Sequence, residues 1–368
     1  MLRNTMPLLA LAGGLLLAGC RPLPEAGSPV FVDSEYGALT EVIVGLPYGR
    51  SPDPDAPWLQ ETLKILPPEE AEYTLATAGM SWEKMIHPVK KKSETELLEA
   101  ENLELIKVLE KLGVKVFRPR RLTEEFIVRN YGREVLANGF SQDFPRDNMI
   151  VIGNQAIEFN LRTMLRRADI SGFREILAGK FKQGKMRWIA MPHSAPLAVP
   201  SSDEPALEGG DLVIVGRTIL VGNTLNKAVG SNRAGCDWIQ QALGREYAVV
   251  SVPLVEQILH LDCVLSVPRR GLAIVCEEAF VEGIPSCVRD WDLIKVPLAD
   301  ASRLAVNGLP VDEKNYVMSY NDHVSNDYVR GELEKRGIKV HPVYFGTHNG
   351  QGGSIRCATQ PLKRAAAR

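Results

Sequence analysis

The sequence predicts an α/β domain built from repeated units that each contain a β-hairpin, a helix and a further strand. In three places an acidic residue precedes two short apolar runs separated by a turn, which is typical of a buried hairpin. These units begin at Asp147, Asp211 and Asp262, so successive starts are 64 residues (147 to 211) and 51 residues (211 to 262) apart. This spacing leaves room for a hairpin and one helix–strand connection per unit. We therefore expect a ring or stack of ββαβ modules in a single domain.

The N-terminus has the pattern of a targeting segment. Arg3 precedes an apolar run at 7–19 that is too short to span a bilayer. The run ends in Leu17-Ala18-Gly19-Cys20, which resembles the bacterial lipobox, in which the cysteine is lipidated after cleavage. The sequence therefore predicts a signal peptide at 1–20 and lipidation of Cys20. A flexible tether at 21–36 would follow, and the protein would be anchored in the bacterial cell envelope, on the periplasmic face of the outer membrane.

The folded domain is expected at 37–364, with a short tail at 365–368. Its first strand is predicted at 39–45. The clearest helix begins at Ser93, where Glu96 stands at the capping-box position three residues later, and ends at Gly113. A short strand follows at 114–117.

Two patterns recur along the rest of the chain. The helix–glycine–strand pattern is repeated at 333–340 and, more loosely, at 239–250. The predicted hairpins pair 149–152 with 156–159, 212–215 with 218–221, and 263–267 with 272–275.

The residues that precede the predicted strands carry the polar groups of a candidate site. If the modules surround an axis, equivalent positions bring Asp147, Glu208, His260 and Asp262 to a common centre. Near the C-terminus, a glycine pair precedes Cys357, and a tight glycine turn is a common way to present a nucleophilic thiol. We expect the loop that carries Cys357 to cap this centre.

A thiol among several carboxylates and one imidazole suits a cationic substrate. Carboxylates raise the pKa of a neighbouring thiol or imidazole and repel anions, but two of them can bind the paired N–H donors of a guanidinium. Asp147 and Asp262 are the candidates for this pair. Attack by Cys357 on the guanidino carbon would give a covalent amidino-thioether, with His260 as general acid and base. Glu208 would hold the guanidinium nitrogens or orient His260.

Four arginines are candidates for binding a carboxylate on the substrate, because arginine meets carboxylates through two parallel hydrogen bonds. They are Arg146, Arg162, Arg166 and Arg167. A solvated helix face is the competing interpretation of the last three.

The motifs together resemble those of the guanidino-group-modifying superfamily, which contains arginine deiminases, dimethylargininases and amidinotransferases. In chain order they are Arg146-Asp147-Asn148, Glu208-Gly209-Gly210-Asp211, His260-Leu261-Asp262 and Gly352-Gly353-Ser354-Ile355-Arg356-Cys357. The resemblance implies an α/β-propeller of five pseudo-symmetric ββαβ modules. It also implies a Cys357 nucleophile, His260 as general acid and base, and guanidinium-binding carboxylates at Asp147, Glu208 and Asp262, with no cofactor.

Within the superfamily the signals point in two directions. The segment 208–211 resembles the corresponding motif of the hydrolases, in which water breaks down the amidino intermediate. The segments 40–45 and 146–158 look more like those of amidinotransferases, which pass the amidino group to an amine. Because Glu208 lies in the chemical centre, hydrolysis of arginine or a related guanidino compound is the expected reaction. Amidino transfer is the alternative, and a non-catalytic lipoprotein that binds arginine-like ligands is the second alternative.

Composition and residue types indicate which other partners and ligands to expect. The chain has 368 residues, 45% hydrophobic and 24% charged, with a net charge of -2, and its Lys and Arg residues are spread out, so we expect no nucleic-acid partner. His260, Asp262, Glu208 and Cys357 match metal-ligand types, but the expected substrate already supplies a cation, so no metal is predicted. A homodimer is an expected assembly. Whether a disulfide forms among Cys236, Cys263, Cys276 and Cys287 is left open by the sequence.

Overall fold

The structure is a computed structural model that describes residues 27–63, 68–162, 164–192, 204–227, 229–323 and 326–367. The predicted signal peptide at 1–20 and its lipidation site Cys20 lie outside these ranges. Within them, no helix is both long enough and apolar enough to cross a membrane.

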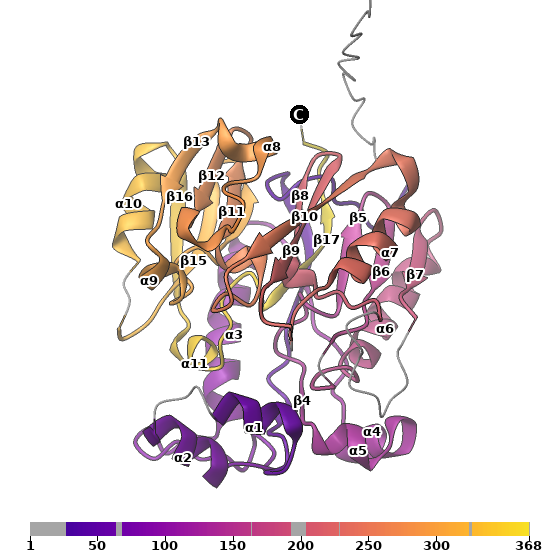
Figure 1. Cartoon of the computed structure of the whole chain (residues 1–368), viewed down its shortest axis with the longest axis vertical. Coiled ribbons are helices and arrows are strands. Elements are labelled where there is room, and N and C mark those ends of the chain that lie inside the picture. The colour runs from indigo at the N-terminus through magenta and orange to yellow at the C-terminus, as the bar shows by residue number, and fades with distance from the viewer. Residues whose placement is uncertain are drawn as a thin grey trace, which may run out of the picture.

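Over the described residues, the strands form five three-stranded sheets and one two-stranded sheet (Figure 1). In each three-stranded sheet one strand pairs antiparallel with the central strand, and the other pairs parallel with it. The sheets are β17 (Thr359–Arg364), β1 (Leu39–Val44) and β3 (Lys115–Phe117); β5 (Met149–Ile152), β6 (Gln155–Glu158) and β7 (Arg187–Ala190); β8 (Leu212–Val215), β9 (Thr218–Thr224) and β10 (Ala248–Leu254); β11 (Leu265–Arg269), β12 (Leu272–Val275) and β13 (Asp292–Lys295); and β14 (Leu309–Asp312), β15 (Asn315–Tyr320) and β16 (Lys339–Tyr344).

Helices connect the central strand of each of these sheets to its parallel neighbour, which gives the ββαβ unit that the sequence predicts. The last helix before the parallel strand is α3 (Glu94–Lys111), α6 (Ile170–Phe181), α7 (Arg233–Leu243), α8 (Ser286–Arg289) or α10 (Asp327–Lys335). Figure 1 shows α6 and α10 at opposite outer edges of the molecule. The described sheets remain separate, without a strand shared between two of them.

The helix predicted from Ser93 is α3, and its first turn is held as the sequence indicates. The Ser93 Oγ accepts a hydrogen bond from the Glu96 N–H at 3.2 Å, and the Glu96 carboxylate accepts one from the Ser93 N–H at 2.7 Å. Each bond satisfies a backbone donor that the first turn of a helix would otherwise leave unpaired. Leu98, Leu105 and Leu109 are fully buried on its inner face.

The three hairpins predicted from the sequence are confirmed as β5–β6, β8–β9 and β11–β12. Gly153 and Gly216 have positive φ angles of 56° and 64° in the first two turns, and Gly271 has 79° in the third, a conformation that glycine adopts without strain. A fourth hairpin, β14–β15, was not expected.

The N-terminal part of the described chain packs into the domain. Phe31 donates a backbone hydrogen bond to Leu362 at 3.0 Å and accepts one from Arg364 at 2.7 Å, and Val32 exchanges two bonds with Gly153. Val30 and Phe31 are buried. The predicted tether at 21–36 is therefore wrong over 28–36, where the chain is packed against the sheets, while 21–26 lie outside the described residues.

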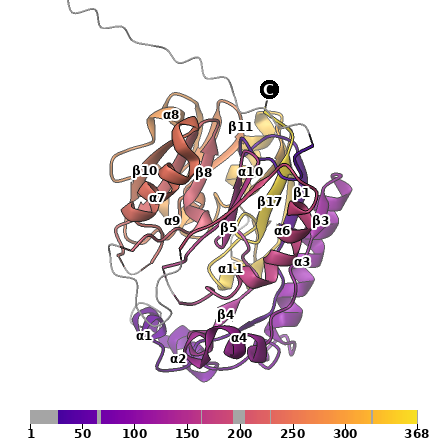
Figure 2. The same ribbon diagram turned by 90° about the vertical axis from the view of Figure 1, so that its right-hand side faces the viewer.

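A helical layer covers one end of the molecule, at the bottom of Figure 1, and lies below the sheets in Figure 2 as well. It contains α1 (Pro57–Leu63), α2 (Pro68–Ala76), α4 (Glu124–Tyr131) and α5 (Arg133–Ala137), next to the two-stranded sheet of β2 (Gly49–Arg50) and β4 (Phe140–Ser141). The short helices α9 (Leu298–Ala301) and α11 (Gly346–Gly350) precede β14 and β17.

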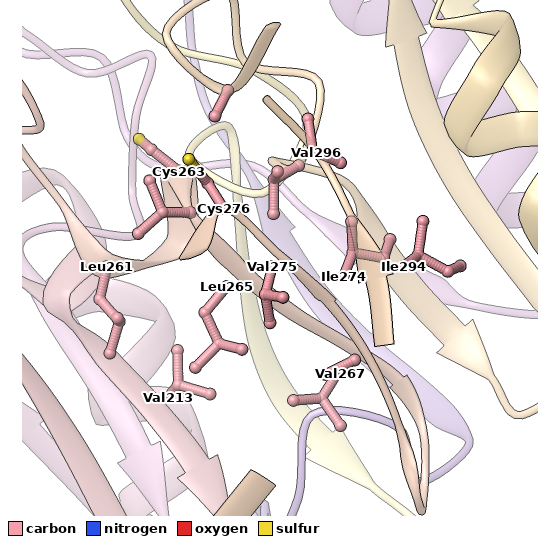
Figure 3. Close-up of a cluster of buried hydrophobic side chains, with 14 of the residues drawn as sticks. Val213, Leu261, Cys263, Leu265, Val267, Ile274, Val275, Cys276, Ile294 and Val296 are labelled. Carbon is pink, nitrogen blue, oxygen red and sulfur yellow. The ribbon is translucent and has the colours of Figure 1, made fainter. Parts of the chain in front are cut away.

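The largest apolar cluster fills the space around β11, β12 and their neighbours (Figure 3). Leu265, Ile274 and Val275 contribute from these strands and are almost fully buried. Leu261 and Cys263 belong to the same cluster, so the apolar core fixes both neighbours of Asp262. This anchoring holds a candidate site residue in place through hydrophobic packing.

Candidate active site

In each three-stranded sheet, the strand that pairs antiparallel with the central strand is preceded by a polar residue or a thiol of the candidate site. Asp147 precedes β5, Glu208 precedes the 3-10 turn before β8, His260 and Asp262 precede β11, and Cys357 precedes β17. The fifth sheet follows the same rule, because Asn307 precedes β14. The similar topology of the sheets thus explains why residues 210 positions apart in the chain (147 to 357) contribute to one site.

Glu208, His260 and Asp147 form a buried polar group. The His260 Nε2 lies 2.7 Å from the Glu208 Oε2, within hydrogen-bond distance, and its Nδ1 lies 3.8 Å from the Asp147 Oδ1. The exposed fraction of each of these residues is 6% or less. Glu208 therefore orients His260, one of the two roles expected for it.

The glycines of the motif at 208–211 allow the backbone to approach this group closely. A Cβ on Gly210 would lie 2.6 Å from the His260 Nδ1, and a Cβ on Gly209 would lie 1.9 Å from the Arg146 carbonyl oxygen. Gly210 uses this proximity to donate its N–H to the Asp147 Oδ1 at 3.2 Å. A side chain at Gly210 would displace the imidazole and the Asp147 carboxylate, and a side chain at Gly209 would displace the Arg146 backbone.

Asp147 and Asp211 are held by further contacts. The Asp147 Oδ2 forms an ion pair with the Arg166 Nη1 at 2.6 Å. Asp211 accepts hydrogen bonds from the backbone N–H groups of Ser231 at 2.9 Å and Leu261 at 3.2 Å, and so ties the β8 turn to the β11 turn. Asp211 is thus a structural carboxylate.

Asp262 has an unused carboxylate oxygen. Its Oδ2 is buried and accepts no hydrogen bond from the described residues, and its nearest cationic partner is the Arg146 Nε at 3.8 Å. Burial raises the pKa of Asp262, while Arg146 and His260 lower it. A buried acceptor without a donor is unfavourable unless a ligand supplies one, and a guanidinium supplies several.

Arg146 does not fit its predicted role in binding a substrate carboxylate. Its exposed fraction is 1%, and its Nη2 donates to the Leu212 carbonyl oxygen and lies 3.9 Å from the Glu35 Oε1. Together with Asp262 and Glu35 it lines a cavity of about 10 Å³, which holds one water molecule at most. Arg146 therefore supports Asp262 from within the protein.

Cys357 is positioned by Asn307, a residue that the sequence interpretation missed. The Asn307 Oδ1 accepts hydrogen bonds from the Cys357 N–H and the Cys357 thiol, both at 3.4 Å, and from the Arg356 N–H at 3.1 Å. Its Nδ2 donates to the Asp262 carbonyl oxygen at 3.3 Å. The available signal was an apolar hairpin pattern at 309–320, preceded by this asparagine.

The site holds the His260 imidazole and the Cys357 thiol in their proton-bound forms. Burial alone would lower the pKa of His260, but Asp147, the hydrogen bond to Glu208 and Asp211 raise it to about 10. Burial raises the pKa of the Cys357 thiol, and Asp262 and Asp147 raise it further. At neutral pH the empty site therefore contains an imidazolium and a neutral thiol.

The comparisons with known proteins agree with this geometry. The family model of eukaryotic N,N-dimethylarginine dimethylhydrolases matches residues 142–364, more than half of the chain. The chain belongs to this family. It is therefore an enzyme that acts on guanidino groups, and the non-catalytic alternative does not hold.

Relatives of this dimethylhydrolase-family chain include transferases as well as hydrolases. The L-arginine:L-lysine amidinotransferase of Pseudomonas savastanoi pv. phaseolicola is 24% identical over 367 residues, which covers 92% of this chain and 95% of the relative. A solved amidinotransferase of saxitoxin biosynthesis from Microseira wollei has a TM-score of 0.71 at 23% identity, covering 92% of this chain and 98% of its own. The solved adduct of a dimethylarginine dimethylaminohydrolase with S-methyl-L-thiocitrulline has a TM-score of 0.58 at 15% identity. The match covers 88% of this chain and 100% of the solved chain. At these identities the solved structures establish the mixed α/β fold alone.

The remaining cysteines in the described part of the chain are free thiols. Cys236, Cys263, Cys276 and Cys287 form no disulfide. No group of three or more His, Cys, Asp or Glu side chains in the described part of the chain is arranged to hold a metal ion.

A variant with Asn307 replaced by leucine tests how this dimethylhydrolase-family site positions its thiol. We expect Asn307→Leu to lower kcat/KM roughly 10- to 100-fold, because the Cys357 loop loses three hydrogen bonds of the Asn307 Oδ1. Steady-state kinetics and the melting temperature should be measured together. The matched control is Asn315→Leu, at the first position of β15, which should leave kcat/KM unchanged. Equal losses in the two variants would contradict a specific role for Asn307.

His348 is a buried structural histidine beside the Cys357 loop. Its Nδ1 lies 2.6 Å from the Glu101 Oε2 and its Nε2 lies 2.9 Å from the Asp143 Oδ2, while its ring stacks on Phe345 with ring centroids 3.8 Å apart. The ion pairs connect α3 to the segments before β5 and β17. His348 therefore stabilises the loop that carries Cys357.

His348 also predicts a pH dependence of stability. Burial would lower its pKa, but Asp143 and Glu101 raise it to about 9 in the folded protein, above the usual value of 6.5. The group therefore stabilises the fold fully below about pH 6.5, and this contribution disappears as the pH rises through about 9. We expect His348→Gln to cost about 3 kcal/mol of unfolding free energy near pH 6 and much less near pH 10, measured by urea denaturation. A pH-independent difference would contradict this interpretation.

Proposed function

We propose that the protein hydrolyses the guanidino group of arginine or a related compound through a covalent amidino intermediate on Cys357. The observation that carries this proposal is the buried Asp262 carboxylate, whose Oδ2 accepts no hydrogen bond from the described residues and which interacts electrostatically with the Cys357 thiol. A substrate guanidinium supplies the missing N–H donors and places its carbon next to the sulfur.

The residues of the site suggest the following sequence of steps. The Cys357 thiol loses its proton to solvent water when the guanidinium binds, and the thiolate attacks the guanidino carbon to form a tetrahedral adduct. A proton from the His260 imidazolium passes to the departing nitrogen. The carbon–nitrogen bond breaks, and the amidino group stays on the sulfur. Water then attacks the same carbon, with His260 taking its proton, and the carbon–sulfur bond breaks to return Cys357 and release a ureido product.

The substrate itself contributes to activation of the thiol. In the empty site, burial and two carboxylates raise the pKa of Cys357. A bound guanidinium neutralises Asp262 and Asp147 and adds a positive charge next to the sulfur, and both effects favour the thiolate. The nucleophile is therefore formed where and when a guanidino carbon is present.

Hydrolysis is the main reaction in this proposal, because Glu208 fixes His260 as an acid and base that can activate water. Amidino transfer to an amine is the second candidate. It is supported by the amidinotransferase of Pseudomonas savastanoi pv. phaseolicola, whose similarity extends over 92% of this chain.

The deciding assay incubates the purified protein with L-arginine, agmatine or methylarginine, with and without glycine or lysine as amine acceptors. Hydrolysis predicts a ureido product and free ammonia or alkylamine without any acceptor. Product only in the presence of an acceptor, with the amidino group recovered on that amine, would establish the transferase alternative instead. No conversion of any guanidino compound would overturn both reactions.

Two further features belong to the proposal. Five sheets with the same strand pairing support an α/β-propeller of five modules around the site. The sequence at 7–20 supports a lipid anchor at Cys20 and a position in the bacterial cell envelope, and a homodimer remains a prediction. Replacing Cys20 with serine should release the protein from the membrane fraction, and unchanged fractionation would contradict the anchor.

A further inference from the structure

Glu35 is a buried carboxylate of the N-terminal segment that interacts with arginines of the domain core. Its exposed fraction is 5%, and its Oε2 forms an ion pair with the Arg356 Nη2 at 2.8 Å. Its Oε1 lies 3.9 Å from the Arg146 Nη2. Burial would raise the pKa of Glu35, but Arg356, Arg146 and Arg364 lower it to about 2. Glu35 is therefore an anion at neutral pH.

Hydrogen bonds fix the Glu35 carboxylate in place. The Ile214 N–H donates to its Oε1 at 3.1 Å. Its partner Arg356 is held in turn, because the Arg356 Nη1 donates to the Thr359 carbonyl oxygen at 3.2 Å. The carboxylate thus has a defined position from which it attracts Arg146.

Arg146 lies between the carboxylates of Glu35 and Asp262. Its Nη2 is 3.9 Å from the Glu35 Oε1, and its Nε is 3.8 Å from the Asp262 Oδ2, so neither contact is a hydrogen bond. The Arg146 Nε and the Asp262 Oδ2 are both buried without a hydrogen-bond partner among the described residues. The three side chains line the cavity of about 10 Å³, which leaves room for a small movement of the guanidinium. The apolar residues that line it include Val213, Leu265 and Val267 (Figure 3).

The position of Arg146 matters because it is an internal guanidinium next to the acid that binds the guanidinium of the substrate. A hydrogen-bonded ion pair between Arg146 and Asp262 would supply the Asp262 Oδ2 with a donor, so a substrate would have to compete with the protein's own side chain. The Glu35 anion attracts Arg146 in the opposite direction. We propose that Glu35 is a positioning residue that keeps Arg146 out of hydrogen-bond distance of Asp262 and so leaves Asp262 available to the substrate. This inference rests on the proposed function, because it concerns the substrate-binding acid of that reaction.

The test measures the Kd of L-arginine by calorimetry in the Cys357→Ser protein, which cannot consume the ligand. We expect the added Glu35→Gln substitution to weaken binding roughly 10- to 100-fold, because Arg146 then moves onto Asp262. A further Arg146→Gln substitution removes the competing guanidinium and should restore most of the lost affinity, which a merely structural role of Glu35 does not predict. With Cys357 intact, Glu35→Gln should raise KM more than it lowers kcat.

The matched control is Glu158→Gln in the same Cys357→Ser protein. Glu158 is also a buried glutamate paired with an arginine, because its Oε2 lies 2.6 Å from the Arg174 Nη2, but it has no contact with Arg146 or Asp262 among the printed ion pairs of the described chain. Its replacement should leave the Kd of arginine unchanged.

The outcomes separate this inference from the function on which it rests. An unchanged Kd in Glu35→Gln, or a loss of affinity that Arg146→Gln does not restore, would overturn the role of Glu35 and leave the guanidino reaction intact. Absence of turnover of every guanidino compound, together with arginine binding that weakens and recovers as expected, would overturn the reaction and leave the role of Glu35. If Glu35→Gln does not fold, as judged by its melting curve, Glu35→Asp decides: its shorter carboxylate lies farther from Arg146, so weaker binding that Arg146→Gln restores is expected, and an unchanged Kd would overturn the inference.

Discussion

The Cys357→Ser variant is expected to lose about 10⁴-fold or more of the wild-type kcat/KM, because a serine hydroxyl in this site cannot form the covalent amidino intermediate. Cys357 is 4% exposed, and its thiol donates a hydrogen bond to the Asn307 Oδ1, which a hydroxyl can also donate. The fold should therefore be retained. Turnover should be measured together with calorimetric binding of arginine, which the variant should still bind.

Cys263→Ser is the control for this prediction. Cys263 is the other buried thiol next to Asp262, with its Sγ 3.7 Å from the Asp262 Oδ1. Its replacement should leave most of the activity. An active Cys357→Ser protein, or an inactive Cys263→Ser protein with a normal melting temperature, would contradict the assignment of the nucleophile.

Replacement of His260 by asparagine should lower kcat by about 10²- to 10⁴-fold, with a smaller effect on KM, because proton transfer to the departing nitrogen and from water would be lost. The kinetic constants should be compared over a range of pH. His341→Asn, a half-buried histidine on β16 that binds Asn315, is the control. A main effect on KM in His260→Asn would instead indicate a role in binding alone.

Local sequence patterns were sufficient to predict much of the fold. The capping box at Ser93 and Glu96 depends on residues three apart, and the three hairpins depend on apolar runs of four or five residues with a turn between them. Such features are determined by short-range geometry and hydrophobic periodicity, so a single sequence shows them.

The features that the sequence did not predict depend on contacts between distant segments. The pairing of β1 with β17 joins residues more than 300 positions apart, and the packing of Val30 and Phe31 occurs in a stretch whose Pro and Gly content indicated a tether. Asn307 gave no signal of its own, because an isolated asparagine before a strand is a common turn residue.

The sequence predicted which residues of the candidate site lie together, while their catalytic roles stay predictions. Asp147, Glu208, His260 and Asp262 lie together because equivalent positions before equivalent strands meet, which is a property of the repeat. The role of Arg146 was wrong because an arginine next to a site residue can point inward, and here its side chain turns toward Leu212 and Glu35. The direction in which a single side chain points at a turn cannot be predicted from the sequence pattern.

The most direct test of the proposed mechanism is to identify the residue that carries the amidino group during turnover. The protein is mixed with arginine labelled with ¹³C in the guanidino carbon, quenched with acid at successive times, and its peptides are analysed by mass spectrometry. We predict a transient labelled amidino group on the peptide that contains Cys357, formed before the ureido product and absent in Cys357→Ser. A label on the Cys263 peptide, or accumulation of product with no label on Cys357 at any quench time, would contradict the proposed mechanism.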